Sequence, residues 1–280
     1  MGAPFVVIGM HRSGTSLVSR ILDKSGIMMG RDLQSDHESK FFIELNKWIY
    51  QNAGADWARP KALEELIDYA PARKQVEEYL RIRIASSSSK KFSGQNLNNG
   101  LFDMNSKWGW KDPRNGPSLP IWKDIWPEMY VIHVVRHGVD VAASLHSRSL
   151  KNWTEDEGRF KKWVKMYKWR SSKSPIRKGQ RAATLPHAIE FWAEQMEVEK
   201  KVLQRFENVL EIRYEDLLTD PSVILKKIWN YIGKEDDEKL LAEIEGMVDH
   251  SRAFAYRQNR ELTAFAQENE AILERFGYSA

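Results

Sequence analysis

The sequence is 280 residues long, with 43 Lys and Arg against 39 Asp and Glu, a formal net charge of +4 and 42% hydrophobic residues. This length and apolar content suffice for a substantial core and argue against disordered, collagen-like and coiled-coil proteins. The sequence has no cysteine, which excludes a disulfide framework, a thiolate metal site and a cysteine nucleophile. The apolar run Phe5–Met10 is too short for a signal peptide, and no later stretch nears the ~18 apolar residues of a membrane span. We therefore expect a soluble cytoplasmic protein.

The chain predicts three units in which a buried strand is followed by a loop and a helix. The strands are expected at residues 4–8, 129–135 and 209–212, and the helices that follow them begin near Gly14, Val139 and Pro221. Further helices are expected at about 38–52, 61–69, 72–84 and 187–206, with a polar loop over 86–100. Strands that alternate with helices predict an α/β fold, a mostly parallel sheet between two layers of helices, and we expect one domain over 1–280. Ligands of such sheets bind beyond the carboxyl ends of the strands.

The segment between the first strand and its helix has the layout of a phosphate-binding loop. Within Gly9–Ser16, its candidate anion ligands are His11, Arg12, Ser13, Gly14, Thr15 and Ser16. Backbone N–H groups and the helix N-terminus present partial positive charge to an anion there, and Arg12 adds a fork of donors. The spacing matches a Walker A loop, but Thr15 stands where that loop has lysine, and Arg136 follows the 129–135 strand where an aspartate would hold Mg²⁺. The sequence thus predicts an anion site that works without metal.

Two further motifs follow the later strands. Arg136 leaves the sheet at the end of the second strand and Ser144 lies eight residues on, in the next helix, so both can meet on one phosphate. The segment Arg213-Tyr214-Glu215-Asp216-Leu217 follows the third strand. With the phosphate loop, and in this order over residues 5–232, these motifs resemble the sulfotransferases that use 3′-phosphoadenosine-5′-phosphosulfate (PAPS). The arginine form of the loop is similar to that of tyrosylprotein sulfotransferases and many bacterial members.

The resemblance implies a P-loop-like sulfotransferase fold and transfer of a sulfuryl group from PAPS, with 3′,5′-adenosine bisphosphate (PAP) as product and no metal. It assigns Arg12 and the rest of the loop to the 5′-phosphosulfate, Arg136 and Ser144 to the 3′-phosphate, and Tyr214 to the neighbourhood of the adenine. The family's C-terminal cofactor loop falls near 251–257, where Arg252 and Arg257 are both candidates for the 3′-phosphate.

Glu38 is the candidate general base. The segment His37-Glu38-Ser39-Lys40 is similar to those that begin with the catalytic glutamate in heparan-type and tyrosylprotein sulfotransferases. Lys40 replaces the His or Arg that these families carry two residues on, which leaves its role open. His37 is the competing base, because cytosolic sulfotransferases for small phenols and steroids use a histidine. In those enzymes, however, the histidine follows the second strand of the family fold, in a K-T-H motif. The matching place in this sequence, ahead of the 129–135 strand, holds Lys111-Asp112-Pro113 and no histidine.

Lys111 is the third catalytic candidate, with Glu38 and Arg12. The segment Trp108–Arg114 resembles the K-D-P-R segment of bacterial sulfotransferases, which implies a lysine at a strand end that neutralises charge on the transferring sulfuryl group. Arg114 is expected to hold Asp112 in a structural pair. The implied reaction is in-line attack on sulfur by a hydroxyl or amine of the acceptor, with Glu38 removing the proton.

Residues 148–181 concentrate the basicity, with twelve Lys and Arg against three acidic residues and with Trp and Tyr interleaved. This composition predicts a basic insert or lid over 148–185 on the acceptor side, suited to a glycan or another anionic or aromatic acceptor. Two other classes stay open: nucleic-acid binding through the insert, and a P-loop-type kinase of nucleotides or small molecules, against which the missing lysine counts. Because the rest of the chain is mildly acidic, we do not expect general binding of nucleic acid.

Overall fold

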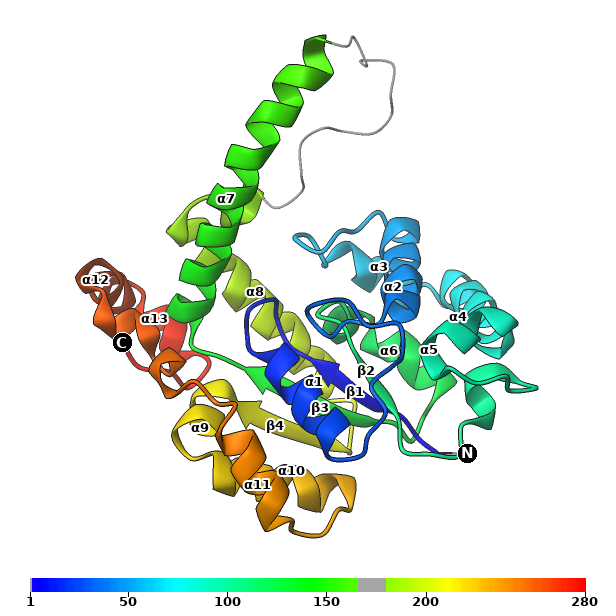
Figure 1. Ribbon diagram of the computed structural model, residues 1–280. Coiled ribbons are helices and arrows are strands. Elements are labelled where there is room, and N and C mark those ends of the chain that lie inside the picture. Colours follow the sequence, from blue (N-terminus) through cyan, green and yellow to red (C-terminus); the bar gives the residue numbers. More distant parts are fainter. Residues whose placement is uncertain (1, 166–179) are drawn as a thin grey trace. The chain divides into compact units, whose positions relative to one another are not determined.

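The computed structural model describes residues 2–165 and 180–280, and their side chains except those of 153–165 (Figure 1). Two compact units divide the chain. The first is built from Met1–Arg136 and Met196–Phe254, and the second from His137–Gln195 and Ala255–Ala280. The expectation of one domain stays a prediction.

Four parallel strands form the sheet of the first unit, in the order β2 (Gly109–Lys111), β1 (Phe5–Ile8), β3 (Tyr130–Val135) and β4 (Val209–Arg213). In this register Phe5 lies between Gly109 and Tyr130, and Val131 lies opposite Val209. All of β1 is buried, as expected of a parallel strand covered on both faces. The predicted α/β fold is confirmed, and each of the three predicted strands ends within one residue of the observed one.

Alternate side chains of β1 enter two cores, one on each face of the sheet. Val6 and Ile8 pack with residues of α2 (Lys40–Asn52), α3 (Ala62–Asp68), α4 (Ala70–Ala85) and α6 (Asn115–Ile125). Phe5 and Val7 pack with residues of α1 (Thr15–Lys24), α9 (Tyr214–Thr219), α10 (Pro221–Ile232) and α11 (Glu238–Glu245). The first unit is therefore a sheet between two helical layers.

Three helices depart from the predictions. Within the polar loop expected over 86–100, the short helices η1 (Ser87–Ser89) and α5 (Lys90–Ser93) form, because Phe92 is fully buried against Phe42 at a centroid distance of 5.0 Å. The helix expected to begin near Val139 is α7 (Gly138–Lys165), which continues into the predicted basic insert. The remaining helices are η2 (Gly100–Asp103), η4 (Gln180–Ala182), α8 (Leu185–Leu203), η5 (His250–Arg252), η6 (Ala255–Gln258), α12 (Arg260–Glu268) and α13 (Glu270–Glu274).

The start of α7 is tightly packed within the second unit. His137 stacks on Tyr256 at 4.3 Å, and its Nε2–H donates to the carbonyl of Ser279 at 3.0 Å. Asp140 accepts a hydrogen bond from the backbone N–H of Tyr256 at 2.9 Å. Throughout the described residues, no helix combines the length and the apolar content that crossing a membrane requires.

Candidate active site

The phosphate loop requires glycine at its two ends. Gly9 has φ +136°, and a Cβ there would lie 2.3 Å from the carbonyl oxygen of Val134 on β3. Gly14 has φ +98°, and a Cβ there would lie 2.1 Å from the ring of Tyr214. Real Cβ atoms do not approach other atoms so closely, so the backbone of this loop lies against β3 on one side and against Tyr214 on the other.

The loop closes on itself and opens into a helix N-terminus. The Ser13 hydroxyl, almost fully buried, donates to the carbonyl of Met10 at 2.7 Å. Among the described residues no side chain caps the N-terminus of α1, and its first turn carries no acidic residue. The first amides of α1 are thus oriented for an anion, with Arg12 exposed beside them. The ring of His11 lies edge-on to Trp57 at 5.2 Å.

Arg136, at the end of β3, ties the loop to two other segments. Its guanidinium donates to the carbonyl of Arg12 at 3.1 Å and to that of Arg252 at 3.3 Å. It also lies over the ring of Tyr214, 4.9 Å from the centroid. The Tyr214 ring therefore packs between Gly14 and Arg136 and supports the backbone of the phosphate loop at Gly14.

Several predicted ligands of the 3′-phosphate belong to different units. Ser144 lies on α7 in the second unit, so its pairing with Arg136 stays a prediction. Arg257 belongs to the second unit as well, where its Nε–H donates to the hydroxyl of Tyr256 at 3.2 Å. Of the two arginine candidates, only Arg252 lies in the unit of Arg136.

Glu38 and Lys111 form a buried ion pair. Lys111 Nζ donates to Glu38 Oε1 at 3.0 Å, and the two side chains are 2% and 6% exposed respectively. Lys111 Nζ also donates to the carbonyl oxygen of Asp36 at 2.8 Å, and the hydroxyl of Ser16 donates to the same oxygen at 2.8 Å. The structure thus joins the first turn of α1, the turn before α2 and the end of β2.

The environment shifts the pKa of each candidate base, Glu38 and His37. Burial raises the pKa of Glu38, and the charge of Lys111 opposes that shift without cancelling it. Burial lowers the pKa of His37, and the positive charges of Arg20 and Lys111 add to this effect. A raised pKa makes the Glu38 carboxylate a stronger base near neutral pH, whereas His37 becomes a weaker one.

The turn that carries Glu38 is held in an unfavourable backbone conformation. His37 has φ +60°, which costs a residue with a Cβ about 1 kcal/mol. Gln34 and Glu38 are joined by a backbone hydrogen bond of 2.9 Å, and His37 donates to Gln34 at 3.0 Å. Lys40, whose role the sequence leaves open, is the exposed first residue of α2.

A buried polar network supports the end of β2. The predicted pair of Asp112 and Arg114 is present at 3.3 Å, and Arg114 also lies 4.0 Å from Glu38. Asn46 on α2 donates to Asp112 at 3.0 Å and to Asn115 at 2.8 Å. Neither asparagine is indicated by the sequence, since a single Asn in a helix carries no signal of its own.

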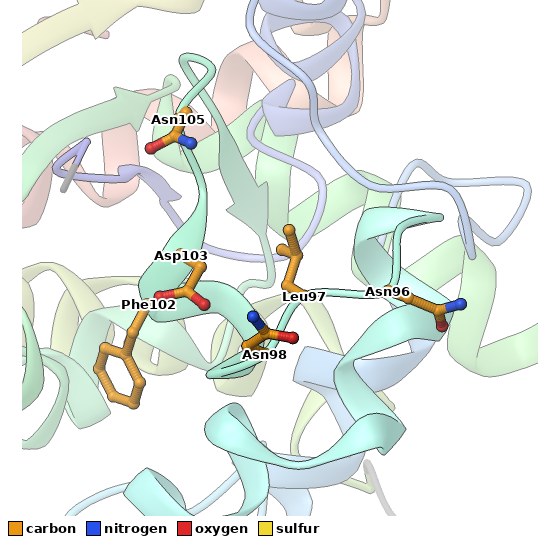
Figure 2. A pocket seen from close by; sticks show the side chains of 6 residues that line it. All are labelled: Asn96, Leu97, Asn98, Phe102, Asp103 and Asn105. Atoms are coloured by element: carbon orange, nitrogen blue, oxygen red, sulfur yellow. The ribbon is translucent and has the colours of Figure 1, made fainter.

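A separate pocket of about 390 Å³ lies in the first unit (Figure 2). It is lined by Asn96, Leu97, Asn98, Phe102, Asp103 and Asn105. None of the predicted site residues lines it, and its one carboxylate, on Asp103, accepts a hydrogen bond from the backbone of Asn99 at 2.8 Å. We therefore place the candidate active site at the phosphate loop and not in this pocket.

Other predicted features fall partly outside the described residues. Of the basic insert predicted over 148–185, residues 166–179 lie outside them, as do the side chains of 153–165. Within the described part of the chain, no cluster of three or more His, Asp or Glu residues has an arrangement suited to a metal ion.

Comparison with known proteins gives a family and a fold. A family model described as "Sulfotransferase family" matches residues 4–238. Two solved structures are similar. The sulfotransferase domain from the Synechococcus PCC 7002 olefin synthase has a TM-score of 0.54 and 17% identity, covering 100% of this chain and 97% of that one. The sulfotransferase domain from the curacin biosynthetic pathway has a TM-score of 0.50 and 16% identity, covering 96% and 97%. A sequence search of curated proteins finds no match.

Proposed function

Because the chain belongs to the sulfotransferase family, we propose that its site moves a sulfuryl group from PAPS to a hydroxyl or amine of an acceptor, with Glu38 as general base. The observation that carries this proposal is the buried pair of Glu38 and Lys111, whose turn is bound to the phosphate loop through the carbonyl of Asp36. A buried acid–base pair beside an anion-binding loop is what sulfuryl transfer to a neutral nucleophile needs.

The residues present fit the donor. The glycine cradle and the uncapped N-terminus of α1 suit a 5′-phosphosulfate, with Arg12 as an added cation. The Arg136 guanidinium, directly after β3, donates to the backbone carbonyl of Arg252, and we assign the second phosphate to this arginine, with Arg252 as the second candidate. When bound, PAPS supplies an activated sulfuryl group on a phosphate that is a good leaving group.

The chain's own residues then handle the proton and the charge. A bond forms between the acceptor atom and sulfur while the bond between sulfur and the bridging phosphate oxygen breaks. The acceptor proton passes to the Glu38 carboxylate, and the electron pair leaves with PAP. An ammonium has three N–H donors. Lys111 gives two of them to Glu38 and Asp36, and in the proposed reaction the third would neutralise charge on an oxygen of the sulfuryl group.

A thermal-shift panel tests the donor assignment. We expect PAP to raise the melting temperature without Mg²⁺, by about 5 °C at a hundredfold excess over its Kd. Stabilisation by ATP only with Mg²⁺ would indicate the kinase instead, and salt-sensitive binding of oligonucleotides regardless of PAP would indicate nucleic-acid binding. No response to PAP would contradict the donor assignment.

Labelled PAPS with glycans, phenols, lipids and peptides identifies the acceptor and tests the base. We expect Glu38→Gln to lower turnover by about 10²–10⁴-fold while the Kd for PAP stays within twofold of wild type. Glu44→Gln on α2 is the matched control, since its side chain is 62% exposed, and we expect wild-type turnover from it. Near wild-type turnover by Glu38→Gln would show that another group is the base.

A further inference from the structure

Arg114 is a mostly buried arginine that uses one of its side-chain hydrogen-bond donors. Its side chain is 13% exposed, and its Nη1 donates to Asp112 at 3.3 Å. The Tyr50 hydroxyl donates to its backbone carbonyl at 3.1 Å. A guanidinium has five N–H donors, and no hydrogen bond from the described residues engages Nε or Nη2. Neither nitrogen is among the atoms buried without a partner, so solvent reaches both. Asp112 and Tyr50 thus hold Arg114 in place and leave donors for a ligand.

The candidate base presents an oxygen to the same space. Lys111 Nζ donates to Glu38 Oε1 at 3.0 Å, and no group among the described residues donates to Oε2. Oε2 is not among the atoms buried without a partner either, so solvent reaches it. Arg114 Nη2 lies 4.0 Å from this oxygen. Glu38 therefore faces Lys111 with one oxygen and Arg114 with the other, and Oε2 is the oxygen that can take a proton from an acceptor.

The distance between Arg114 and Glu38 suits one bridging oxygen atom. A direct hydrogen bond between Nη2 and Oε2 would need about 2.7–3.2 Å, which is shorter than the observed 4.0 Å. An oxygen about 2.8 Å from both atoms would make an angle of about 90° between them. Such an oxygen accepts the N–H of Arg114 and donates its own proton to Glu38. A general base needs this proximity to the proton that it removes.

A hydroxyl and an amine fit this arrangement differently. A hydroxyl oxygen has one proton and two lone pairs. Its proton is donated to Glu38, one lone pair accepts the hydrogen bond of Arg114, and the other lone pair attacks sulfur. A neutral amine nitrogen has a single lone pair, and when that pair attacks sulfur, nothing on the nitrogen accepts from Arg114. A site that is built to hydrogen-bond a substrate hydroxyl discriminates strongly against an analogue that leaves its polar groups without partners.

We propose that Arg114 binds the reacting oxygen of the acceptor and thereby selects hydroxyl acceptors over amines. This role rests on the proposed function and narrows it to transfer to a hydroxyl. The hydroxyl oxygen forms its bond to sulfur with one lone pair, its proton passes to Glu38 Oε2, and the electron pair of the breaking bond between sulfur and the bridging oxygen leaves with PAP. The guanidinium stabilises the negative charge that develops on the acceptor oxygen as the proton departs.

The test uses two variants of Arg114 and one matched control. Arg114→Gln removes the charge and the planar fork, whereas Arg114→Lys keeps the charge beside Asp112 and guards against a loss of folding. Arg73→Gln is the control, because Arg73 is tied to Asp124 at 2.6 Å near the other end of α6. By calorimetry we expect all three variants to bind PAP with a Kd within twofold of wild type, since none of these arginines is assigned to the donor.

Labelled PAPS with phenol and with aniline measures the selection. Both acceptors are neutral at pH 8 and differ in the reacting atom, and the intrinsic reactivity of each cancels when variants are compared. We expect wild type and Arg73→Gln to favour phenol by at least about a hundredfold. In Arg114→Gln we expect kcat/KM for phenol to fall by about 10²–10³-fold, and in Arg114→Lys at least tenfold, with the value for aniline within threefold of wild type. A hydroxyl acceptor from the wider panel is compared with its amine analogue in the same way.

Crystal structures test the bridging position without an acceptor. With PAP bound, we expect a water oxygen within about 3.2 Å of both Glu38 Oε2 and Arg114 Nη2, and the loss of this water in Arg114→Gln. A direct hydrogen bond between the two side chains, with no oxygen between them, would overturn the proposal. Equal losses for phenol and aniline in Arg114→Gln would overturn the selection. If wild-type protein binds no PAP, the proposed function fails, while crystals of the protein alone still test the bridging position.

Discussion

Replacing Gly14 by alanine tests whether the phosphate loop is shaped by its contact with Tyr214. A Cβ at this position would lie 2.1 and 2.4 Å from two ring carbons, more than 1 Å inside an ordinary contact. The ring has no room to retreat, because it is buried and the guanidinium of Arg136 lies over it at 4.9 Å. The loop itself must therefore move, and the amides of α1 move with it.

The free-energy cost of Gly14→Ala has two parts, steric overlap and backbone strain, and a control variant separates them. Overpacking of this size costs about 1–3 kcal/mol, and the positive φ costs about 1–2 kcal/mol more. Gly26 has nearly the same φ, +95° against +98°, but its Cβ would meet nothing within 4 Å in the described residues. Gly26→Ala therefore carries the backbone cost alone, and Gly14→Ala carries both.

Chemical denaturation and calorimetry with PAP measure the loss together. Strain retained in the folded loop lowers the free energy of unfolding, and strain relieved by moving the loop weakens PAP binding. We expect the two losses in Gly14→Ala to sum to about 3 kcal/mol, against about 1–2 kcal/mol, all of it in stability, for Gly26→Ala. Equal total losses in the two variants, with unchanged PAP affinity in both, would refute the contact as a determinant of the loop.

Three further predictions follow from the same geometry. Arg136→Ala is expected to weaken PAP at least tenfold more than adenosine 5′-phosphosulfate, measured by calorimetry, since only PAP carries the 3′-phosphate; equal losses would reject that role. Lys111→Met removes the charge that holds down the pKa of Glu38, so the carboxyl ¹³C titration of Glu38 is expected to move to higher pH, and turnover to fall about 10²–10³-fold; an unmoved titration would mean that the pair does not form in solution. Burial alone lowers the pKa of His133, but its hydrogen bonds to Glu199 (3.0 Å) and Glu211 (3.2 Å) outweigh burial and raise that pKa to about 9. Because the pKa of His133 is raised on folding, this stabilisation is complete below pH 6.5 and is lost as the pH rises through about 9. Urea unfolding should therefore show that the free energy of unfolding falls by up to about 3 kcal/mol over this pH range. We expect His133→Gln to abolish this loss and the exposed His187→Gln to retain it; stability that rises over the same range would contradict the prediction.

The sequence predicts the strands well where burial is the dominant signal. β1 and β3 follow runs of apolar residues that end at Gly9 and Arg136, and they are almost entirely buried, whereas β4 (Val209–Arg213) is interrupted by the exposed Glu211 and is only partly buried. β2 has three residues, too few for any alternation, and only the family resemblance points to it. α5 forms in a serine-rich stretch because one residue, Phe92, is buried, and composition cannot show that.

The site is predictable as separate residues but not as a connected arrangement. Glu38 and Lys111 each follow from a motif, 73 residues apart, and nothing in either motif specifies the 3.0 Å contact between them. The oxygen that joins them to Ser16 belongs to the backbone of Asp36, and a carbonyl group has no sequence signal. The left-handed conformation of His37 cannot be predicted from the sequence either, because histidine, unlike glycine, does not indicate a positive φ.

The order of the strands in the sheet sets the order in which the proposed site residues lie along its carboxyl edge. At the carboxyl edge of the sheet, Lys111 ends β2, the phosphate loop follows β1, Arg136 follows β3 and Tyr214 follows β4. Adjacent strands lie about 4.8 Å apart, so these groups span about 14 Å in the order β2, β1, β3, β4. In a donor whose 5′-phosphosulfate binds the loop and whose 3′-phosphate binds Arg136, we expect the sulfur to face β2, where Glu38 and Lys111 lie. We therefore predict that the turn over residues 33–39 and the start of α2 contribute to the binding of the acceptor.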